Sequence, residues 1–200
     1  IEGGENPPIP RRTPRGETKV FNQECLIITS PEFKSFATNL RDLHILKGIS
    51  SAVVTTDWIY INYPEAEDPP YPGYWNSSIE GWSNIVGYNY SLAKRIISFL
   101  RDDSAHPNLK YITLLGDAQH VPPSYYIYIK HYGTYDNWIP TDFFYSSPEY
   151  DMIPNYAIGR ISVKTADEAE STANKIVQWT ATLKWEWFKS CLLYTSDAAD

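Results

Sequence analysis

Short apolar runs and longer amphipathic segments alternate along the chain. The run Cys25-Leu26-Ile27-Ile28-Thr29 is apolar throughout, as in strands that are buried on both faces. From Phe33 to Leu43 apolar residues recur at three- and four-residue spacing, which predicts a helix that begins at Ser30-Pro31 and ends at Gly48. We interpret four runs as strands: residues 25–29, 51–56, 109–115 and 156–160.

Two further amphipathic segments predict helices. One runs from about residue 83 or 91 to 102, and the other, with apolar positions from Ala169 to Val177, extends to about residue 188. The second opens with Thr165-Ala166-Asp167-Glu168, a capping box in which hydroxyl and carboxylate satisfy free backbone donors. Alternating strands and helices predict an α/β fold, a Rossmann-like three-layer domain with a mostly parallel sheet flanked by helices. Phe99 and Tyr111 are expected in its core.

Three segments lack a regular period. Residues 1–23, which are rich in proline near their start, predict an extended linker. In residues 57–82 prolines separate aromatic and acidic residues, which predicts a surface insertion. Residues 118–150 are rich in tyrosine, and we expect one strand there, at residues 125–129.

Composition narrows the classes of function. The 200 residues include 24 acidic and 17 basic ones, for a net charge of −7, which argues against a general nucleic-acid binder. No apolar run approaches the roughly 20 residues that span a bilayer. The sequence therefore predicts neither a nucleic-acid partner nor a membrane span.

The ends of the chain suggest a piece of a longer protein. Ile1 stands where an initiator methionine would, so any export signal would lie upstream. Residues 191–200 can be encoded by the end of a sequencing-library adapter, and we interpret them as an artefact. We therefore expect a fragment whose gene continues past about residue 190.

The carboxyl ends of the predicted strands are where ligands gather in such a fold. Candidates there are Thr29 with Ser30, Thr55 to Asp57, and Asp117 with His120 close behind. No glycine-rich phosphate cradle follows any strand, which argues against dinucleotide or P-loop chemistry. The Asp117–His120 pair could bind a metal or move protons, but a role in capping a turn is favoured.

Cysteine and acidic residues leave alternatives open. Cys25 could be a nucleophile beside one of four histidines, but on a buried strand a free cysteine behaves as a small hydrophobe. The four are His44, His106, His120 and His131. Acidic residues in loops are either solvated or ligating, and calcium is a possible structural ion for Glu65, Glu67 and Asp68. Asp136 and Asp142 lie among aromatic residues, and a role as solvated loop acids is favoured for them over a part in the chemistry.

Five segments, taken in order, resemble the first part of the gingipain-type cysteine peptidase domain. These are Cys25 to Phe33; Lys47-Gly48-Ile49 with Val53 to Thr56; Leu114 to Ala118 with Val121-Pro122; Thr141-Asp142-Phe143-Phe144-Tyr145; and Ala157 to Glu170. The resemblance covers residues 24–190 and implies the first of two α/β subdomains of a caspase-like catalytic unit. It implies a cysteine endopeptidase whose Cys–His dyad lies in the second subdomain, so that no catalytic residue is assigned here.

The resemblance also implies features of the whole protein. Asp142 matches a family aspartate near the pocket for the substrate residue before the scissile bond, where a carboxylate would favour Arg or Lys. The chemistry requires no cofactor, although calcium is possible as a structural ion, and the partners would be a protein or peptide substrate and the second subdomain. The second subdomain would dock on an exposed apolar flank. Family members are secreted or at the cell surface.

A binding module is the competing hypothesis. In a degenerate family member without a dyad, Trp58, Trp75 and Trp82 could stack on glycans or peptides. Packing of these aromatics onto the domain is the alternative.

Overall fold

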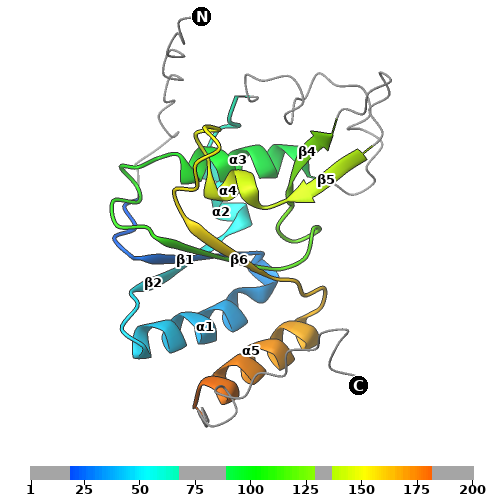
Figure 1. Cartoon of the computed structure of the whole chain (residues 1–200). Coiled ribbons are helices and arrows are strands. Elements are labelled where there is room, and N and C mark those ends of the chain that lie inside the picture. Colours follow the sequence, from blue (N-terminus) through cyan, green and yellow to red (C-terminus); the bar gives the residue numbers. More distant parts are fainter. Residues whose placement is uncertain (1–18, 68–88, 129–136, 182–200) are drawn as a thin grey trace, which may run out of the picture.

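The computed structural model describes residues 19–67, 89–128 and 137–181. Its centre is a sheet of four parallel strands in the order β2-β1-β3-β6 (Figure 1). These strands are β1 (Cys25–Thr29), β2 (Ser51–Thr55), β3 (Tyr111–Leu115) and β6 (Ala157–Ile161). The predicted α/β class and parallel sheet are confirmed.

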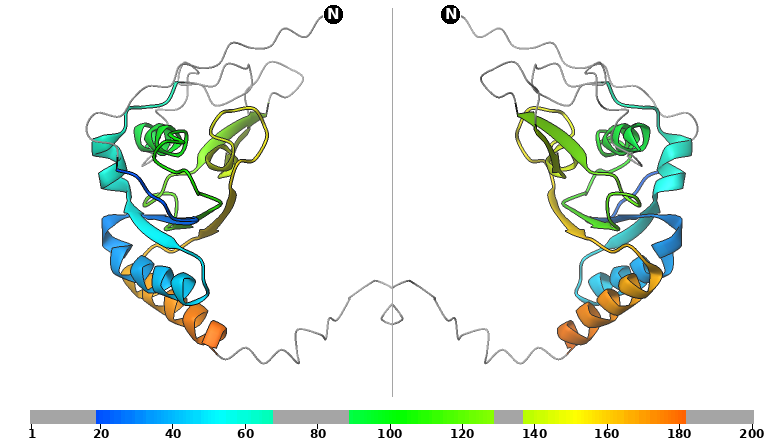
Figure 2. Two further views of the ribbon diagram at one scale, coloured as in Figure 1. Left: turned by 90° about the vertical axis from the view of Figure 1, so that its left-hand side faces the viewer. Right: turned by 90° about the vertical axis from the view of Figure 1, so that its right-hand side faces the viewer.

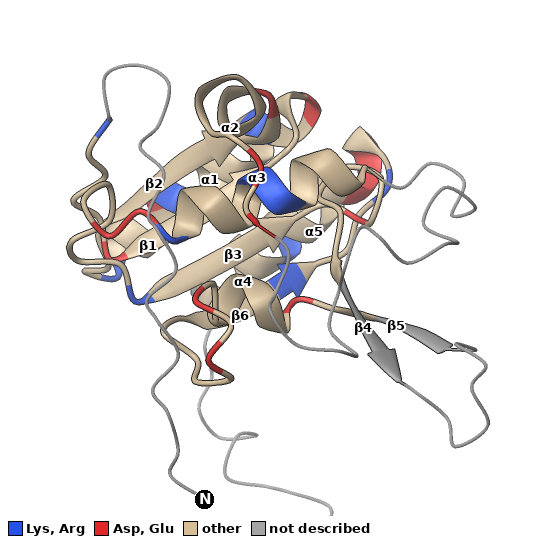
Figure 3. Cartoon of the chain, turned by 90° about the horizontal axis from the view of Figure 1, so that it is seen from above, with Lys and Arg blue, Asp and Glu red and all other residues tan. Residues whose placement is uncertain are grey.

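Helices cover both faces of the sheet, so the domain has three layers (Figure 2). One face carries η1 (Pro31–Phe33), α1 (Lys34–Leu46) and α5 (Ala166–Ala181); the other carries α2 (Thr56–Asn62), α3 (Tyr90–Leu100) and α4 (Phe143–Ser146). A separate two-stranded antiparallel sheet pairs β4 (Ser124–Tyr128) with β5 (Asn137–Thr141). Acidic and basic residues are interspersed over these elements (Figure 3).

Strand β1 is the centre of the core because all five of its residues are buried. Leu26 and Ile28 pack into the cluster under α2 and α3, and Ile27 packs into the cluster under α1 and α5. This two-sided burial explains why the run is apolar at every position rather than at alternate ones.

An aromatic group fills the layer between the sheet and α3. Phe99 is fully buried and meets Phe21, Trp58 and Tyr63 edge to face, at centroid distances of 5.8, 6.0 and 5.0 Å. The expected core position of Phe99 is confirmed. Because Phe21 belongs to this group, the predicted linker cannot extend to residue 23.

The sequence analysis missed α2. It assigned residues 57–82 to a surface insertion, but Thr56–Asn62 is helical, and Ile59, Tyr63 and Ala66 are buried in the core. The first proline of this segment is Pro64, which follows the helix. The proline-rich residues after it led the whole segment to be interpreted as irregular, so the seven-residue helix α2 was not recognised. Residues 68–82 lie outside the described residues.

Three smaller predictions also need correction. Tyr111 is 45% exposed at the start of β3, so it is not the core residue that was expected. The capping box of α5 forms with a shift: Glu168 N–H donates to Thr165 Oγ1, but the Glu168 carboxylate accepts from Lys164 N–H. β5 and α4 were not predicted, because the tyrosine-rich segment shows no clear period.

The aromatic group gives a prediction for stability. Replacing Phe99 with Ala removes a fully buried ring, and we expect a loss of about 3–5 kcal/mol in the free energy of unfolding. Urea unfolding followed by circular dichroism measures it. Leu46→Ala is the control, since Leu46 is 85% exposed and should lose less than about 0.5 kcal/mol. Equal losses would contradict the placement of Phe99.

Candidate functional site

The carboxyl edge of the sheet contains a topological switch point between β1 and β3. From β1 the chain crosses to β2 on one side, whereas β3 leads on to β6 on the other. Such a switch point is where ligands bind in open α/β sheets. Here Thr29 Oγ1 donates to Leu115 O at 2.8 Å and ties the two strand ends together, and the buried Ser30 hydroxyl beside it has no hydrogen-bond partner among described residues.

Asp117 organises the turn that follows β3. Its Oδ1 accepts hydrogen bonds from Gln119 N–H at 3.0 Å and His120 N–H at 3.3 Å, and it lies 2.8 Å from His120 Nδ1. Gly116 is required here, because it has a φ of +136° and a Cβ would lie 2.7 Å from His120 Cβ. The favoured capping role of the Asp117–His120 pair matches this geometry.

His120 is held on several sides. Its ring packs against Phe33 at a centroid distance of 4.3 Å, and Nε2 lies 3.5 Å from Glu32 Oε2. Burial alone would raise the pKa of Asp117, but the hydrogen bonds from His120 and the turn outweigh it and lower that pKa. The turn therefore carries an ionised carboxylate at neutral pH.

Arg160 is the hub of the site. Its Nε and one terminal nitrogen donate to both oxygens of Asp142, at 2.8 and 2.7 Å. The other terminal nitrogen donates to Gly116 O and Val121 O, both at 2.8 Å. One guanidinium on β6 thus fastens the turn after β3 and the segment that joins β5 to α4.

The rest of the Thr-Asp-x-x-Tyr segment is anchored next to this hub. Tyr145, which is fully buried, donates its hydroxyl to Pro122 O, and burial raises the pKa of Tyr145 well above its usual value. Thr141 Oγ1 accepts from Phe143 N–H at 3.1 Å. Between this segment and β6 lies a cavity of about 300 Å³, whose wall includes Asp142 and Arg160.

The structure brings Asp142 to a pocket, but its carboxylate is already engaged. Both oxygens bind Arg160, and the two side chains are 23% and 15% exposed. A substrate side chain would meet an ion pair rather than an unpaired carboxylate. The role of Asp142 in substrate binding stays a prediction.

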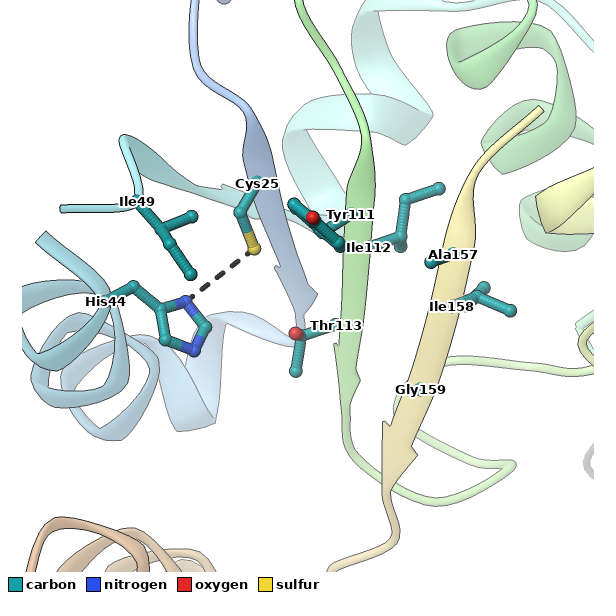
Figure 4. A pocket seen from close by; sticks show the side chains of 9 residues that line it. All are labelled: Cys25, His44, Ile49, Tyr111, Ile112, Thr113, Ala157, Ile158 and Gly159. Carbon is teal, nitrogen blue, oxygen red and sulfur yellow. Dashed lines mark hydrogen bonds between the residues drawn. The ribbon is translucent and has the colours of Figure 1, made fainter. Parts of the chain in front are cut away.

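Cys25 lies away from this edge, at the amino end of β1. It is 2% exposed, and of the candidate histidines that the structure describes His44 is the one in contact: Cys25 Sγ lies 3.7 Å from His44 Nδ1 (Figure 4). Burial raises the pKa of the Cys25 thiol, although hydrogen bonds with Ser51 and Thr113 oppose this, and burial together with the Lys47 charge lowers the pKa of His44. Both groups are therefore neutral at pH 7.

The other histidines have different surroundings. His106 lies in the aromatic group, where Nε2 lies 2.9 Å from Phe99 O and burial lowers its pKa. His120 belongs to the turn described above, and His131 lies outside the described residues. No second Cys–His pair therefore forms in the part of the chain that the structure describes.

The remaining candidates have structural roles where they are described. Glu65 accepts from Ser91 Oγ at 2.5 Å and lies 4.0 Å from Arg95, so its carboxylate is partnered within the protein. Trp58 packs on the aromatic group and does not stand free as a stacking platform. Residues outside the described ranges are Asp68, Asp136, Trp75 and Trp82.

Neither a metal cluster nor a membrane helix is found among the described residues. No group of three or more His, Cys, Asp or Glu side chains there could hold a metal ion. Glu65 is engaged by Ser91 and Arg95 and Asp68 lies outside the described residues, so structural calcium at this loop stays a prediction. Within the same ranges no helix has the length and apolar character needed to cross a membrane.

Comparison with known proteins assigns the family. The model of peptidase family C25 matches residues 19–200, so the chain belongs to this family. This confirms the resemblance drawn from the five segments. Because the match includes residues 191–200, it does not set them apart, and their origin stays a prediction.

A relative and two solved structures were also found. An uncharacterized protein of Archaeoglobus fulgidus is 42% identical over 154 residues, which cover 77% of this chain and 34% of the relative. The Arg-specific cysteine proteinase gingipain R matches 82% of this chain and 30% of its own, at 15% identity and a TM-score of 0.49. Latent PorU from Porphyromonas gingivalis matches over 88% of this chain and 18% of its own length, at 13% identity and a TM-score of 0.48. The chain thus spans about a third or less of these proteins.

Arg160 is the functional residue that sequence reasoning missed. The sequence feature that could have identified Arg160 is its charge, because it is the single charged residue in a strand that a parallel sheet is expected to bury. A carboxylate partner stabilises a partly buried guanidinium, and Asp142, 18 residues earlier, was a candidate.

The hub gives a second prediction. Asp142→Asn leaves Arg160 with an incompletely compensated charge, and we expect a loss of about 3 kcal/mol in the free energy of unfolding. Asp42→Asn breaks the exposed Arg41–Asp42 pair and is the control, with a loss below about 0.5 kcal/mol. Urea unfolding of Asp142→Asn, Arg160→Met, the double variant Asp142→Asn/Arg160→Met and the control measures the coupling between Asp142 and Arg160. Additive losses in the double variant would show that the pair is not coupled.

Proposed function

We propose that this chain forms the first α/β subdomain of a cysteine endopeptidase and acts on protein or peptide substrates only with a second subdomain. The observation that carries this proposal is the position of the thiol. Cys25 and His44 lie at the amino end of the sheet, whereas the polar site lies at the carboxyl edge. A peptidase dyad must place a thiolate against a substrate carbonyl, and a neutral, buried thiol does not do so.

Two further observations support the proposal. The chain belongs to peptidase family C25. It covers 34% of the length of its relative from Archaeoglobus, so most of that protein has no counterpart here. The exposed apolar flank stays a prediction, because Ile61 of α2 and Ile153, which precedes β6, are 74% and 66% exposed but lie on separate elements.

The proposal extends to the site and the compartment. The turn at Asp117 and the hub at Arg160 would form one wall of the substrate cleft, next to a dyad supplied by polypeptide that follows. The protein would work outside the cell or at its surface, where such peptidases meet their substrates.

The isolated chain should be inactive. We expect no hydrolysis of Arg or Lys fluorogenic amides by residues 1–200, measured over hours at micromolar protein. The same gene, extended to the length of its relatives, should hydrolyse peptide amides. Turnover by the 200-residue chain that is lost in Cys25→Ser would overturn the proposal, as would an extended protein without any peptidase activity.

The active, extended protein would also separate two roles for Asp142. If Asp142 contacts a basic substrate side chain, Asp142→Asn lowers kcat/KM for Arg and Lys substrates selectively. If Asp142 only holds Arg160, activity on basic and neutral substrates falls by the same factor, in parallel with thermal stability. Lys in place of Arg160 is the matched variant, because it keeps the charge but not the bidentate geometry.

A further inference from the structure

Strand β6 is one edge of the sheet, and its outer side has no neighbouring strand in the part of the chain that the structure describes. In the order β2-β1-β3-β6 it pairs with β3 alone. Ala157 N–H donates to Lys110 O at 2.9 Å, so the backbone groups of every second residue, starting with Ala157, face β3. The N–H and C=O groups of Ile158 and Arg160 therefore face outward.

These outward groups are unpaired. No described residue donates to or accepts from the backbone of Ile158 or Arg160. Just before them, Tyr156 N–H donates to Ser146 O at 3.2 Å, and the outer pairing ends there. The open stretch thus offers donors and acceptors at the repeat of a β-ladder, which is what an extended polypeptide needs in order to pair with it.

The sequence of β6 leaves this edge unprotected. Natural edge strands often carry proline, lysine or a bulge, but β6 reads Ala-Ile-Gly-Arg-Ile in continuous register with β3, and its Arg160 is paired with Asp142. Gly159 is exposed, and a Cβ built there would meet no described atom within 4 Å, so packing does not require a glycine. Glycine inside a strand often marks a close approach of another backbone.

The open edge runs up to the candidate site. Arg160 and, just after the strand, Ser162 belong to the wall of the cavity of about 300 Å³ that also includes Asp142. Ile158 packs on the α3 side of the sheet, and Arg160, two residues further, lies on the same side. Side chains of an added strand would alternate in the same way, so every second one would lie on the side of this cavity.

We propose that the outer edge of β6 binds the main chain of an extended peptide substrate, which adds to the sheet as a further strand. Main-chain hydrogen bonds to Ile158 and Arg160 hold the peptide, and one of its side chains reaches the cavity. The substrate is the occupant that accounts for an unpaired stretch ending at the candidate site. This inference rests on the proposed peptidase function, because it assigns the edge to the substrate of that site.

Amide hydrogen exchange, followed by NMR on the 200-residue chain, tests the edge directly. In the free chain the amide protons of Ile158 and Arg160 should exchange faster than that of Ala157, which is bonded to β3. Saturation with the uncharged peptide acetyl-Thr-Val-Gln-Val-Thr-amide should slow both at least about tenfold. Slow exchange without peptide, or exchange that the peptide leaves unchanged, would overturn the proposal.

Two N-methylated forms of this peptide separate main-chain pairing from other binding. Only alternate residues of an added strand turn their N–H toward β6. One form is methylated at both valines and the other at glutamine and the last threonine. We expect one form to bind at least about tenfold more weakly than the parent and the other to bind within about twofold of it. Equal losses in both forms would contradict pairing with β6.

Proline variants compare the two edges of the sheet. Ile158→Pro removes an outward donor but no bond to β3, and should weaken the peptide about tenfold. Val53→Pro is the matched control on β2: Cys25 N–H donates to Ser50 O, so the Val53 N–H also faces outward, and peptide binding should not change. If Ile158→Pro does not fold, the N-methylated peptides decide. Equal affinities of the two variants would overturn the proposal.

The oligomeric state and the activity give the remaining distinctions. A dimer of the 200-residue chain that excess peptide does not dissociate, seen by analytical ultracentrifugation, would assign the edge to a second copy and overturn the proposal. Peptide binding is measured without catalysis. An extended protein that binds the peptide at β6 but hydrolyses nothing would therefore refute the proposed function alone, whereas an active protein whose β6 amides ignore the peptide would refute this inference alone.

Discussion

The burial of β1 on both faces is the constraint on which the structure depends. A parallel strand in the middle of a sheet needs a helical layer above and below it, because neither face can be left to water. Leu26 and Ile28 are covered by one layer and Ile27 by the other, and all three are fully buried. The order β2-β1-β3-β6 follows from crossovers that supply these helices, and it places the switch point between β1 and β3.

The polar site is a consequence of that arrangement. Where parallel strands end together, the last carbonyls and the turns after them have no further strand to pair with. Arg160 meets this need with one planar group, which binds Gly116 O, Val121 O and both oxygens of Asp142. Such a hub contributes order to three separate segments, and it holds them only while its charge is balanced.

Elements whose apolar residues follow a regular pattern of burial could be predicted from the sequence. β1 could be predicted because four consecutive apolar residues followed by a β-branched threonine are typical of a buried strand, and α3 because its apolar face recurs with the helical period. The helix α2 could not, because seven residues contain too few repeats to show a period beside a proline-rich segment. Tyr111 is 45% exposed at the first position of β3, and no local pattern reports which positions of a strand the helices cover.

The location of the site could be predicted from the sequence, but the hydrogen bonds and the ion pair within it could not. Strand ends pointed to Asp117 and His120, and the resemblance pointed to Asp142. The pairing of Asp142 with Arg160 joins residues 18 apart on different elements, and only the fold shows that both carboxylate oxygens are engaged. The sequence alone suggested an unpaired Asp142 carboxylate, because it does not reveal that Arg160 is its partner.

Cys25 lies at the opposite end of the sheet from the polar site, and this position limits what family membership says about Cys25. A cysteine in a chain of a cysteine peptidase family invites the role of nucleophile, and His44 beside Cys25 strengthens that impression. Yet strands of a parallel sheet all present their carboxyl ends at one edge, where the turns with Asp117 and Asp142 lie, and Cys25 is the first residue of its strand. A substrate bound at that edge would be separated from the thiol by the length of β1. Position along the strand, rather than residue type, is therefore what distinguishes this Cys–His pair from a peptidase dyad.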